Sequence, residues 1–195
     1  MIDTSTIQKL RRQTNAGIMD IKRALEEAGG DEAKALEILR KLGQKIAQKK
    51  QAERIARDGV IGSYIHPNEK VASLVMLVCE TDFVARNEEF KQLAHDIAMQ
   101  VAAMNPEYIS SGEVPEDIIN KEKEIYKNLP EVQGKPDEVV EKIIQGKLNK
   151  YFEDVCLLNQ KFIKDDSKTI KNLIDEYIAK LGEKIEVKKI VRFAI

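Results

Sequence analysis

Apolar side chains in the first 52 residues recur every three or four positions, the spacing of an amphipathic helix. The pattern predicts three short helices, defined by Ile7 and Leu10; by Ile18, Ile21, Leu25 and Ala28; and by Ala35, Ile38, Leu39, Leu42 and Ile46. A turn at 14–17 separates the first two, Gly29-Gly30 ends the second, and Asp31 is a suitable N-cap for the third. Residues 44–59 are polar and helix-prone, so they form either a charged connector or a continuation of the third helix.

The spacing of apolar residues changes after residue 59. Residues 60–66 and 71–79 are rich in β-branched side chains and flank a turn signal at 67–70, which predicts a hairpin. Because residues 71–79 are nearly all apolar, we expect a central strand that is covered on both faces. The C-terminus predicts another strand, one side of which carries Ile185, Val187, Val191, Phe193 and Ile195, with Lys189 as the exception.

Four further helices are predicted between the hairpin and the last strand. Each begins near a residue that suits a cap or a first turn: Asn87, Pro115, Pro136 and Ser167. Residues 155–163 fit either a loop or a short strand. Because the strands and helices do not alternate as βαβ units, the pattern indicates an α+β fold.

Composition and charge narrow the function classes. The chain has 32 basic and 33 acidic residues and a net charge of −1. It therefore lacks the basic excess typical of proteins whose main ligand is nucleic acid, and no direct nucleic-acid partner is expected. We find neither the apolar core of a signal peptide nor a run long enough to span a membrane. We expect a cytoplasmic protein, although an organelle protein that has lost its transit segment stays open.

Residue types that perform chemistry are present but are not grouped. Cys79 and Cys156 lie far apart and form no CxxC motif, which argues against a disulfide scaffold or a zinc site. His66 follows a predicted strand, and His95 lies off the apolar stripe of a helix, where we expect a surface residue. No phosphate-cradling glycine motif occurs. The residues thus favour a protein-binding function without a cofactor over an enzyme.

Two stretches stand out at this point. The first is LRRQTNAGIMDIKRAL at 10–25, and the second is VCETDFVARN at 78–87, where a carboxylate and a phenyl ring follow a strand. Together and in this order they resemble the elongation factor Ts family, and 151–165 and 187–195 are similar to later parts of that family. The chain departs from the family pattern at Met76 and Val78, and at 67–70 in place of a glycine-rich turn.

The resemblance implies a fold and a domain organisation. We expect an N-terminal three-helix, UBA-like bundle with its helical connector at 1–52. It is followed at 53–195 by an α+β core, in which a small three-stranded antiparallel sheet packs with helices. Short members of the family are homodimers, so the resemblance also implies a dimer whose contact surface lies in the core.

The resemblance further implies a non-enzymatic exchange factor that promotes GDP release from elongation factor Tu, a G protein of translation. Phe83 would insert between helices of that partner's nucleotide domain, with Asp82 beside it, and so disturb its Mg²⁺ and phosphate site. The positions that match partner-binding residues are Thr81, Asp82, Phe83 and Val84 in the second stretch, Arg11, Ile18, Met19 and Lys22 in the first, and His66.

Other interpretations of these residues stay open. From the residues alone, Phe83 could be a core residue under the following helix, and Asp82 could be a helix cap, a contact or both. Ile18 fits the core stripe of its helix, so Met19 is the exposed contact of the two. The alternative function is a non-catalytic adaptor that uses the three-helix module to hold another protein.

Overall fold

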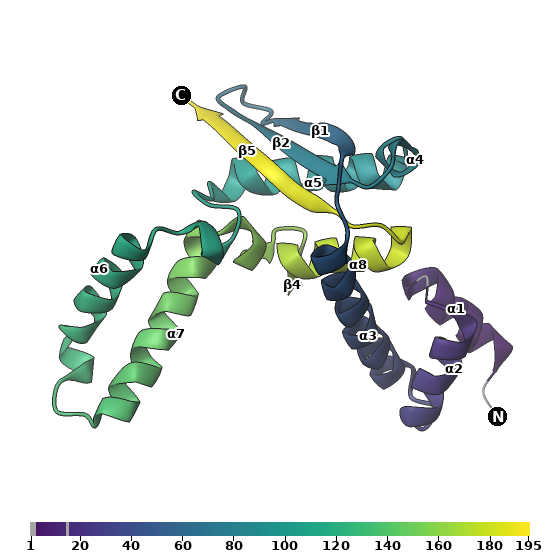
Figure 1. Cartoon of the computed structure of the whole chain (residues 1–195), viewed down its shortest axis with the longest axis horizontal. Helices are drawn as coiled ribbons and strands as arrows, with labels where there is room; N and C mark the ends of the chain where they lie inside the picture. The colour runs from purple at the N-terminus through teal and green to yellow at the C-terminus, as the bar shows by residue number, and fades with distance from the viewer. Residues whose placement is uncertain (1–2, 15) are drawn as a thin grey trace.

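The computed structural model of the chain describes residues 3–14 and 16–195. An α+β core lies between two helical arms, one made by the N-terminal helices and the other by a helical hairpin (Figure 1). Helices and a three-stranded antiparallel sheet are both present, which confirms the predicted fold class. The predicted turn at 14–17 includes residue 15, which lies outside the described residues.

The N-terminal arm consists of α1 (Thr4–Thr14), α2 (Ile18–Glu27) and α3 (Glu32–Glu53). They enclose a small apolar cluster made by Ile7, Leu10, Ile21, Ala24, Leu25, Ala35 and Leu39. The Asp31 carboxylate accepts hydrogen bonds from the backbone N–H groups of Ala33 at 2.9 Å and Lys34 at 3.1 Å, which confirms the predicted N-cap. Most of 44–59 continues α3, so the second interpretation of that segment is correct.

The two halves of α3 pack on different parts of the protein. Its first half belongs to the N-terminal cluster, whereas Ala47 belongs to the core cluster. Gly43 faces α8 (Ile170–Leu181), where an added Cβ would lie 3.4 Å from that of Ala179. Because α8 packs on the second half of α3, the covered side of that half is the one that faces α8. Ile46 lies outside that side and is 40% exposed, so its predicted place in the apolar stripe was wrong. A domain division at residue 52 stays a prediction.

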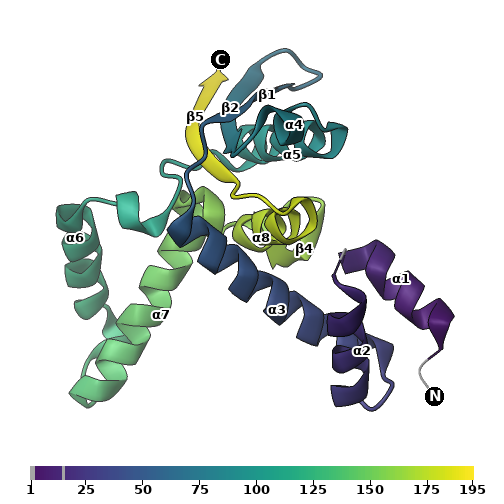
Figure 2. The ribbon, with the colours of Figure 1, turned by 45° about the vertical axis from the view of Figure 1, so that its right-hand side comes forward.

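The core is built on the sheet β1-β2-β5, formed by β1 (Asp58–Ile65), β2 (Val71–Cys79) and β5 (Glu186–Ala194), with both pairs antiparallel. Helix α5 (Glu88–Met104) covers one face of this sheet (Figure 2). Gly62 allows the close approach of β1 and α5, because a Cβ there would lie 2.4 Å from the carbonyl oxygen of Ala94. Asn87 caps α5 as predicted, by accepting the N–H of Glu89 at 2.8 Å.

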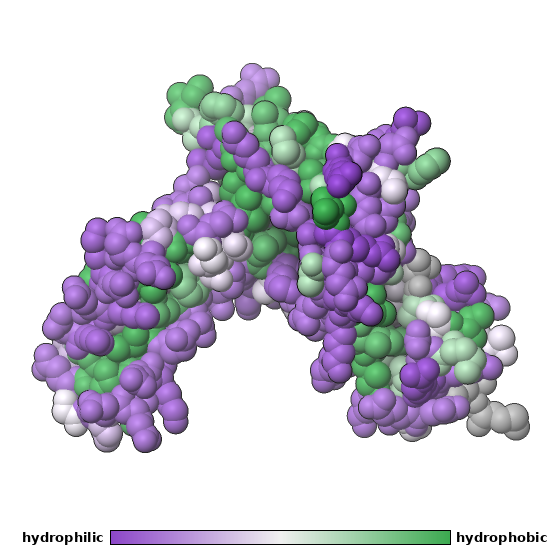
Figure 3. Space-filling view, viewed as in Figure 1, coloured by the Kyte–Doolittle hydropathy of each residue, from purple (hydrophilic) through white to green (hydrophobic). Residues whose placement is uncertain are grey.

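The face of the sheet opposite α5 is open. β2 is the central strand, as predicted, but the expectation that both of its faces are covered was wrong. The side chains at positions 73, 75, 77 and 79 are buried, whereas Leu74 and Met76 are 43% and 40% exposed. A patch of apolar side chains is visible over the strands (Figure 3). In the described chain, this "outer sheet face" exposes Ile61, Ile65, Leu74, Met76 and Phe193.

A β-bulge changes the face that β5 presents. Met76 pairs with Lys189 but Leu77 pairs with Val187, so one residue of β5 is left over. Val187 is therefore buried against the core, while Phe193 lies on the outer sheet face at 62% exposure. The prediction that Ile185, Val187, Val191 and Phe193 share one side was wrong. The break at Lys189 was the sign of the bulge in the sequence.

The second arm is an antiparallel pair of helices, α6 (Glu116–Lys127) and α7 (Asp137–Val155). Residues 155–163 then contain both a 3₁₀ turn (Leu157–Asn159) and the short strand β3 (Lys161–Phe162), which pairs with β4 (Asp165–Thr169). Ser167 lies within β4, so its prediction as the cap of α8 was wrong. Thr169 caps α8 instead, in a capping box with Asn172 that places the helix start two residues later.

Most core side chains are contributed by α5, α8, β2 and β5, and others come from the 3₁₀ turn after α7, from β3 and from the connection before β5. They are mainly aliphatic: Val75, Leu77, Leu93, Ala94, Ile97, Val101, Leu157, Ile170, Leu173, Ile174, Ile178, Ile185 and Val187, with Phe90 and Phe162 among them. This cluster extends to Ala85, the last residue of the short helix α4 (Asp82–Ala85). The core therefore anchors one end of the segment that contains Thr81 to Val84.

Candidate functional site

An exposed phenyl ring follows the central strand. β2 ends at the buried Cys79, Thr81 is the extended N-cap residue of α4, and Phe83 lies in that four-residue helix. The Phe83 side chain is 82% exposed, whereas Ala85 is 5% exposed. Phe83 is therefore not a core residue, and the interpretation made from the residues alone was wrong. Its role in binding a partner stays a prediction.

The orientation of Phe83 follows from the way α4 is anchored. Successive residues of a helix point about 100° apart, so a short helix that buries Ala85 and half-buries Val84 turns Phe83 to solvent. A helix of four residues has little stability of its own. Its position therefore depends on the contacts made by the residues before and after it.

The segment before α4 is held by hydrogen bonds that the sequence did not suggest. The Cys79 thiol donates to the carbonyl oxygen of Thr81 at 3.2 Å. The Glu183 carboxylate accepts from the backbone N–H of Glu80 at 3.1 Å, from that of Thr81 at 3.0 Å, and from the Thr81 hydroxyl at 2.6 Å. Glu183 lies about a hundred positions away in the sequence. No spacing or motif in the chain could have identified this partner.

Glu80 forms a second set of contacts in the same place. Its carboxylate accepts the backbone N–H of Lys184 at 2.6 Å and pairs with Arg54, at the end of α3, at 3.1 Å. Partial burial acts to raise the pKa of Glu80, but the bonds from Lys184 and Arg54 outweigh it, and the pKa lies below its ordinary value. The carboxylate therefore stays ionised at neutral pH and links three segments of the chain.

Asp82 is the first residue of α4, with Thr81 in the N-cap position, and no side-chain hydrogen bond caps the helix. The interpretation of Asp82 as a helix cap was therefore wrong. Its carboxylate pairs with Arg86 at 3.0 Å, and both side chains are substantially exposed. Exposed pairs of this kind contribute only about 0–1 kcal/mol to stability. A partner can therefore compete for the Asp82 carboxylate at little cost.

The N-terminal candidates form a patch on the start of α2. Met19 is 69% exposed, and Ile18, at 44%, is exposed beside it. The placement of Ile18 in the core stripe was wrong, because Ile21, Ala24 and Leu25 already fill that side of the helix. Lys22 is exposed one turn further along, so Ile18, Met19 and Lys22 lie on one open side of α2. Arg11 is exposed near the end of α1.

His66 lies apart from the other candidates. It follows β1, accepts or donates a 3.2 Å hydrogen bond between its Nδ1 and the Tyr64 hydroxyl, and is exposed. The nine residues of β2 separate the turn after β1 from α4. At the rise of a strand, this length of β2 corresponds to a distance of roughly 30 Å. Figure 1 places α4 on the same side of the molecule as α1 and α2. The structure thus groups two of the three predicted contact regions and leaves His66 at the other end of the sheet.

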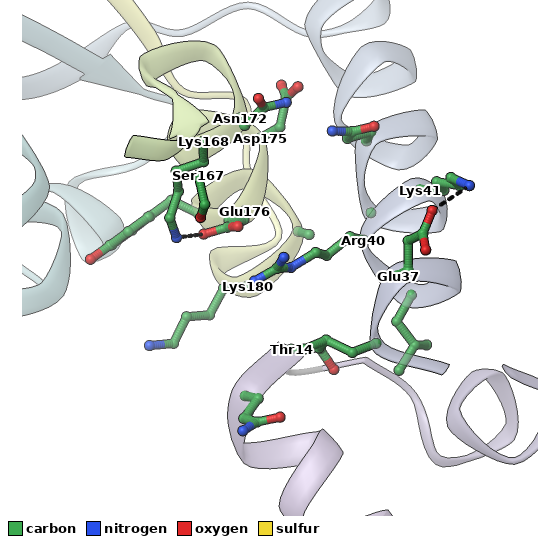
Figure 4. A pocket seen from close by; sticks show the side chains of 17 residues that line it. Thr14, Glu37, Arg40, Lys41, Ser167, Lys168, Asn172, Asp175, Glu176 and Lys180 are labelled. Carbon is green, nitrogen blue, oxygen red and sulfur yellow. Dashed lines mark hydrogen bonds and ion pairs between the residues drawn. The ribbon is translucent and has the colours of Figure 1, made fainter. Parts of the chain in front are cut away.

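A cleft of about 590 Å³ lies between α3 and α8. Arg40 reaches across it from α3 toward α8, and Lys168 pairs with Glu176 at 2.8 Å (Figure 4). No histidine or cysteine is among the described residues that line it, and none of the predicted partner-binding residues does so. Two ion pairs lie within its lining, Glu37–Lys41 at 2.8 Å and Lys168–Glu176.

Within 3–14 and 16–195, no group of three or more histidine, cysteine, aspartate or glutamate side chains is placed to hold a metal ion. None of the helices in this part of the chain is both long and apolar enough to cross a membrane. The candidate site is therefore best described as an exposed ring on a short, well-anchored helix, with a second exposed patch on α2.

Residues 4–195 match the family model described as elongation factor TS. The chain belongs to the elongation factor Ts family. It is 52% identical to elongation factor Ts of Pseudothermotoga lettingae, and the match covers 100% of this chain and 98% of that protein. Elongation factor Ts of Thermodesulfovibrio yellowstonii is 54% identical, with 100% and 96% covered, and that of Thermotoga petrophila is 53% identical, also with 100% and 96% covered. Both the N-terminal helices and the core thus fall within the elongation factor Ts match.

Proposed function

We propose that this protein is a guanine-nucleotide exchange factor that promotes GDP release from elongation factor Tu. It performs no covalent chemistry of its own. The observation that carries the proposal is Phe83, whose ring is 82% exposed on a helix fixed at both ends. A large apolar side chain held in solvent gains burial only in a complex. Membership of the elongation factor Ts family supports the choice of partner.

In the proposed mechanism, the ring enters between helices of the partner's nucleotide domain, with Asp82 beside it. This entry displaces the elements that coordinate Mg²⁺ and the phosphates. Burying one phenyl side chain is worth about 1.5–3 kcal/mol, which is about tenfold to a hundredfold in GDP affinity. Because coupling between two ligands is reciprocal, GDP weakens the binding of the exchange factor by the same factor.

A second contact makes a larger effect possible. The exposed side of α2 with Ile18, Met19 and Lys22, together with Arg11, would dock on the same nucleotide domain. Binding energy from this contact then supports the distortion caused by Phe83. The position of α4 on the same side as the N-terminal helices is consistent with one partner that touches both (Figure 1). His66 would contribute through a separate contact at the far end of the sheet.

Displacement of a fluorescent GDP analogue tests the proposal. Elongation factor Tu is loaded with the analogue, excess unlabelled GDP is added, and the protein is supplied in sub-stoichiometric amounts. The release rate is expected to rise with the amount of protein, and each molecule should act many times. Release at the intrinsic rate would contradict the proposal.

A pull-down separates an exchange factor from an adaptor built on the three-helix module. Immobilised protein is incubated with nucleotide-free elongation factor Tu, and the complex is then washed with GDP. An exchange factor releases its partner into the wash, since GDP and the factor weaken one another. Retention in saturating GDP would favour the adaptor.

We also propose a homodimer, formed by two copies of the outer sheet face. The exposed side chains of Ile61, Ile65, Leu74, Met76 and Phe193 are apolar and can be covered by the same side chains of a second copy, while Lys189, opposite Met76, adds an exposed charge to this face. A C2 dimer needs one self-complementary patch, and open apolar patches of this kind mark interaction sites.

The solution mass of the protein should be twice 22.1 kDa. Met76→Glu should give a monomer, whereas Ile125→Glu, at an exposed position of α6, should not; a wild-type monomer would contradict the proposal.

A further inference from the structure

The connection between α8 and β5, residues 182–185, meets two other parts of the chain. On one side it holds the segment before α4, through the three hydrogen bonds that the Glu183 carboxylate accepts from Glu80 and Thr81. On the other side it holds the end of α3. The Lys50 ammonium donates to the carbonyl oxygen of Gly182 at 2.6 Å, and the Lys184 ammonium donates to that of Gln51 at 2.8 Å.

Beyond the ends of β2 and β5, side-chain carboxylates replace the backbone carbonyl groups as hydrogen-bond acceptors. The last pair between β2 and β5 joins Val78 to Glu186, so the N–H groups of Glu80 and Thr81 have no ladder partner. The Glu183 carboxylate accepts both, while the Glu80 carboxylate accepts the N–H of Lys184 in the opposite direction. The two segments are thus tied in both directions beyond the ends of their strands. Bonds from N–H groups to a carboxylate are stronger than those to a neutral acceptor.

We propose that Glu183 is a positioning residue for nucleotide exchange, an inference that rests on the proposed function. Glu183 fixes the backbone of Glu80 and Thr81 and so determines the direction in which the Phe83 side chain points from the surface. Ala85 anchors the far end of α4 in the core, and Glu183 anchors the near end. Without the carboxylate, the near end of this four-residue helix would keep only the contacts made by Cys79 and Glu80.

The same connection relates the two proposed contact regions to each other. Gly182 and Lys184 hold α3, which leads to the exposed patch on α2, and Glu183 holds α4. A partner that touches both regions then meets them in a fixed relative position. Groups that are already in place lose less conformational freedom when they bind. Loss of Glu183 should therefore reduce both the affinity for the partner and the distortion that Phe83 causes.

The test compares Glu183→Ala with Glu183→Gln in the fluorescent GDP assay. The alanine variant has no acceptor, and we expect the maximal exchange rate to fall about tenfold, with a higher half-saturating concentration. The glutamine amide can accept both N–H groups through its oxygen and donate to the Thr81 hydroxyl, so it should restore most of the rate. Glu176→Ala on α8, which removes an ion pair with Lys168, is the matched control and should exchange like the wild type.

A double-mutant cycle shows whether Glu183 acts through the ring. In the Phe83→Ala background, Glu183→Ala should cause little further loss, since there is no ring left to position. Losses that multiply would overturn the inference, as would a Glu183→Ala variant as active as the wild type. If wild-type protein does not accelerate GDP release at all, the proposed function fails and the inference with it.

Amide hydrogen exchange provides a measurement that does not need activity. In the wild type, the N–H groups of Glu80 and Thr81 should be protected although they lie beyond the β2–β5 ladder. In Glu183→Ala they should exchange faster, while the amides of α5 stay unchanged. Unprotected amides in the wild type would overturn the inference, even if the alanine variant does not fold.

Discussion

Helices α4 and α5 follow each other in the chain. Each carries one phenylalanine, and the two phenyl rings differ in how far they are exposed to solvent. Phe83 in α4 is 82% exposed, and Phe90 in α5 is fully buried. The two rings lie seven residues apart in the chain. The difference lies in the length of the helices. α5 has 17 residues and presents a complete apolar stripe to the sheet, whereas α4 has four and buries only its last residue.

In the proposed mechanism, the protein uses the same type of side chain for stability at one position and for recognition at the other. Phe90 contributes to folding through the apolar surface that it removes from water. The exposed Phe83 buries little apolar surface on folding, and the proposed function assigns its burial to the complex. Substitutions at the two positions should therefore affect different measurements: the free energy of unfolding for Phe90 and the exchange rate for Phe83.

The largest effect is expected for Phe90→Ala. Removing a fully buried phenyl ring leaves a cavity, and the free energy of unfolding should fall by about 3–5 kcal/mol. Chemical denaturation followed by circular dichroism measures this fall. Phe90→Leu is the control and should lose less, since it fills most of the space. A loss under about 1 kcal/mol would mean that the ring is not in the core.

Phe83→Ala should show the reverse pattern. The free energy of unfolding should change by less than about 0.5 kcal/mol, because the ring is exposed. The exchange rate should fall about tenfold to a hundredfold, the value of one buried phenyl group in the complex. Ile125→Ala removes an exposed apolar side chain from α6 and should leave exchange unchanged. A Phe83→Ala variant that exchanges normally would remove the functional half of the comparison.

Met19→Ala tests the second contact region. Met19 is 69% exposed on α2, so its loss should not alter stability measurably. The exchange rate at sub-saturating protein should fall about threefold to tenfold, through weaker binding of the partner. The maximal rate should change less. Met104→Ala, at a 45% exposed position at the end of α5, is the matched control. Equal effects of the two variants would exclude α2 as a contact.

The smallest effect on function is expected from thiol modification. Burial, with the carboxylates of Glu183 and Asp58, raises the pKa of Cys79 to about 11, and burial raises that of Cys156 to about 11. At pH 8 only about one thiol in a thousand is then ionised. Native protein treated with iodoacetamide should stay unmodified and fully active, whereas denatured protein should react at both cysteines. Rapid modification of Cys79 in the native state would mean that the segment before α4 opens easily.

Local patterns in the chain were enough for much of the fold and for part of the site. The helical stripes, the Asp31 and Asn87 caps and the central position of β2 were all predicted, because each depends on neighbouring residues. The second motif also led to α4. Residue patterns alone favoured a core position for Phe83, however, and only the family resemblance indicated exposure. The anchoring of α4 by Glu183 had no local signal at all.

Whatever depends on a distant neighbour had to wait for the fold. Ile18 and Ile46 fit their stripes but are exposed, because other side chains already fill the covered sides of α2 and α3. The β-bulge opposite Met76 changed the face of the sheet to which the side chains at the end of β5 point. The outer sheet face stayed open because no described helix packs on it. Periodicity tells which side chains lie on one side of an element. Whether that side meets a neighbour or water is decided by residues far away along the chain, and these come together only on folding.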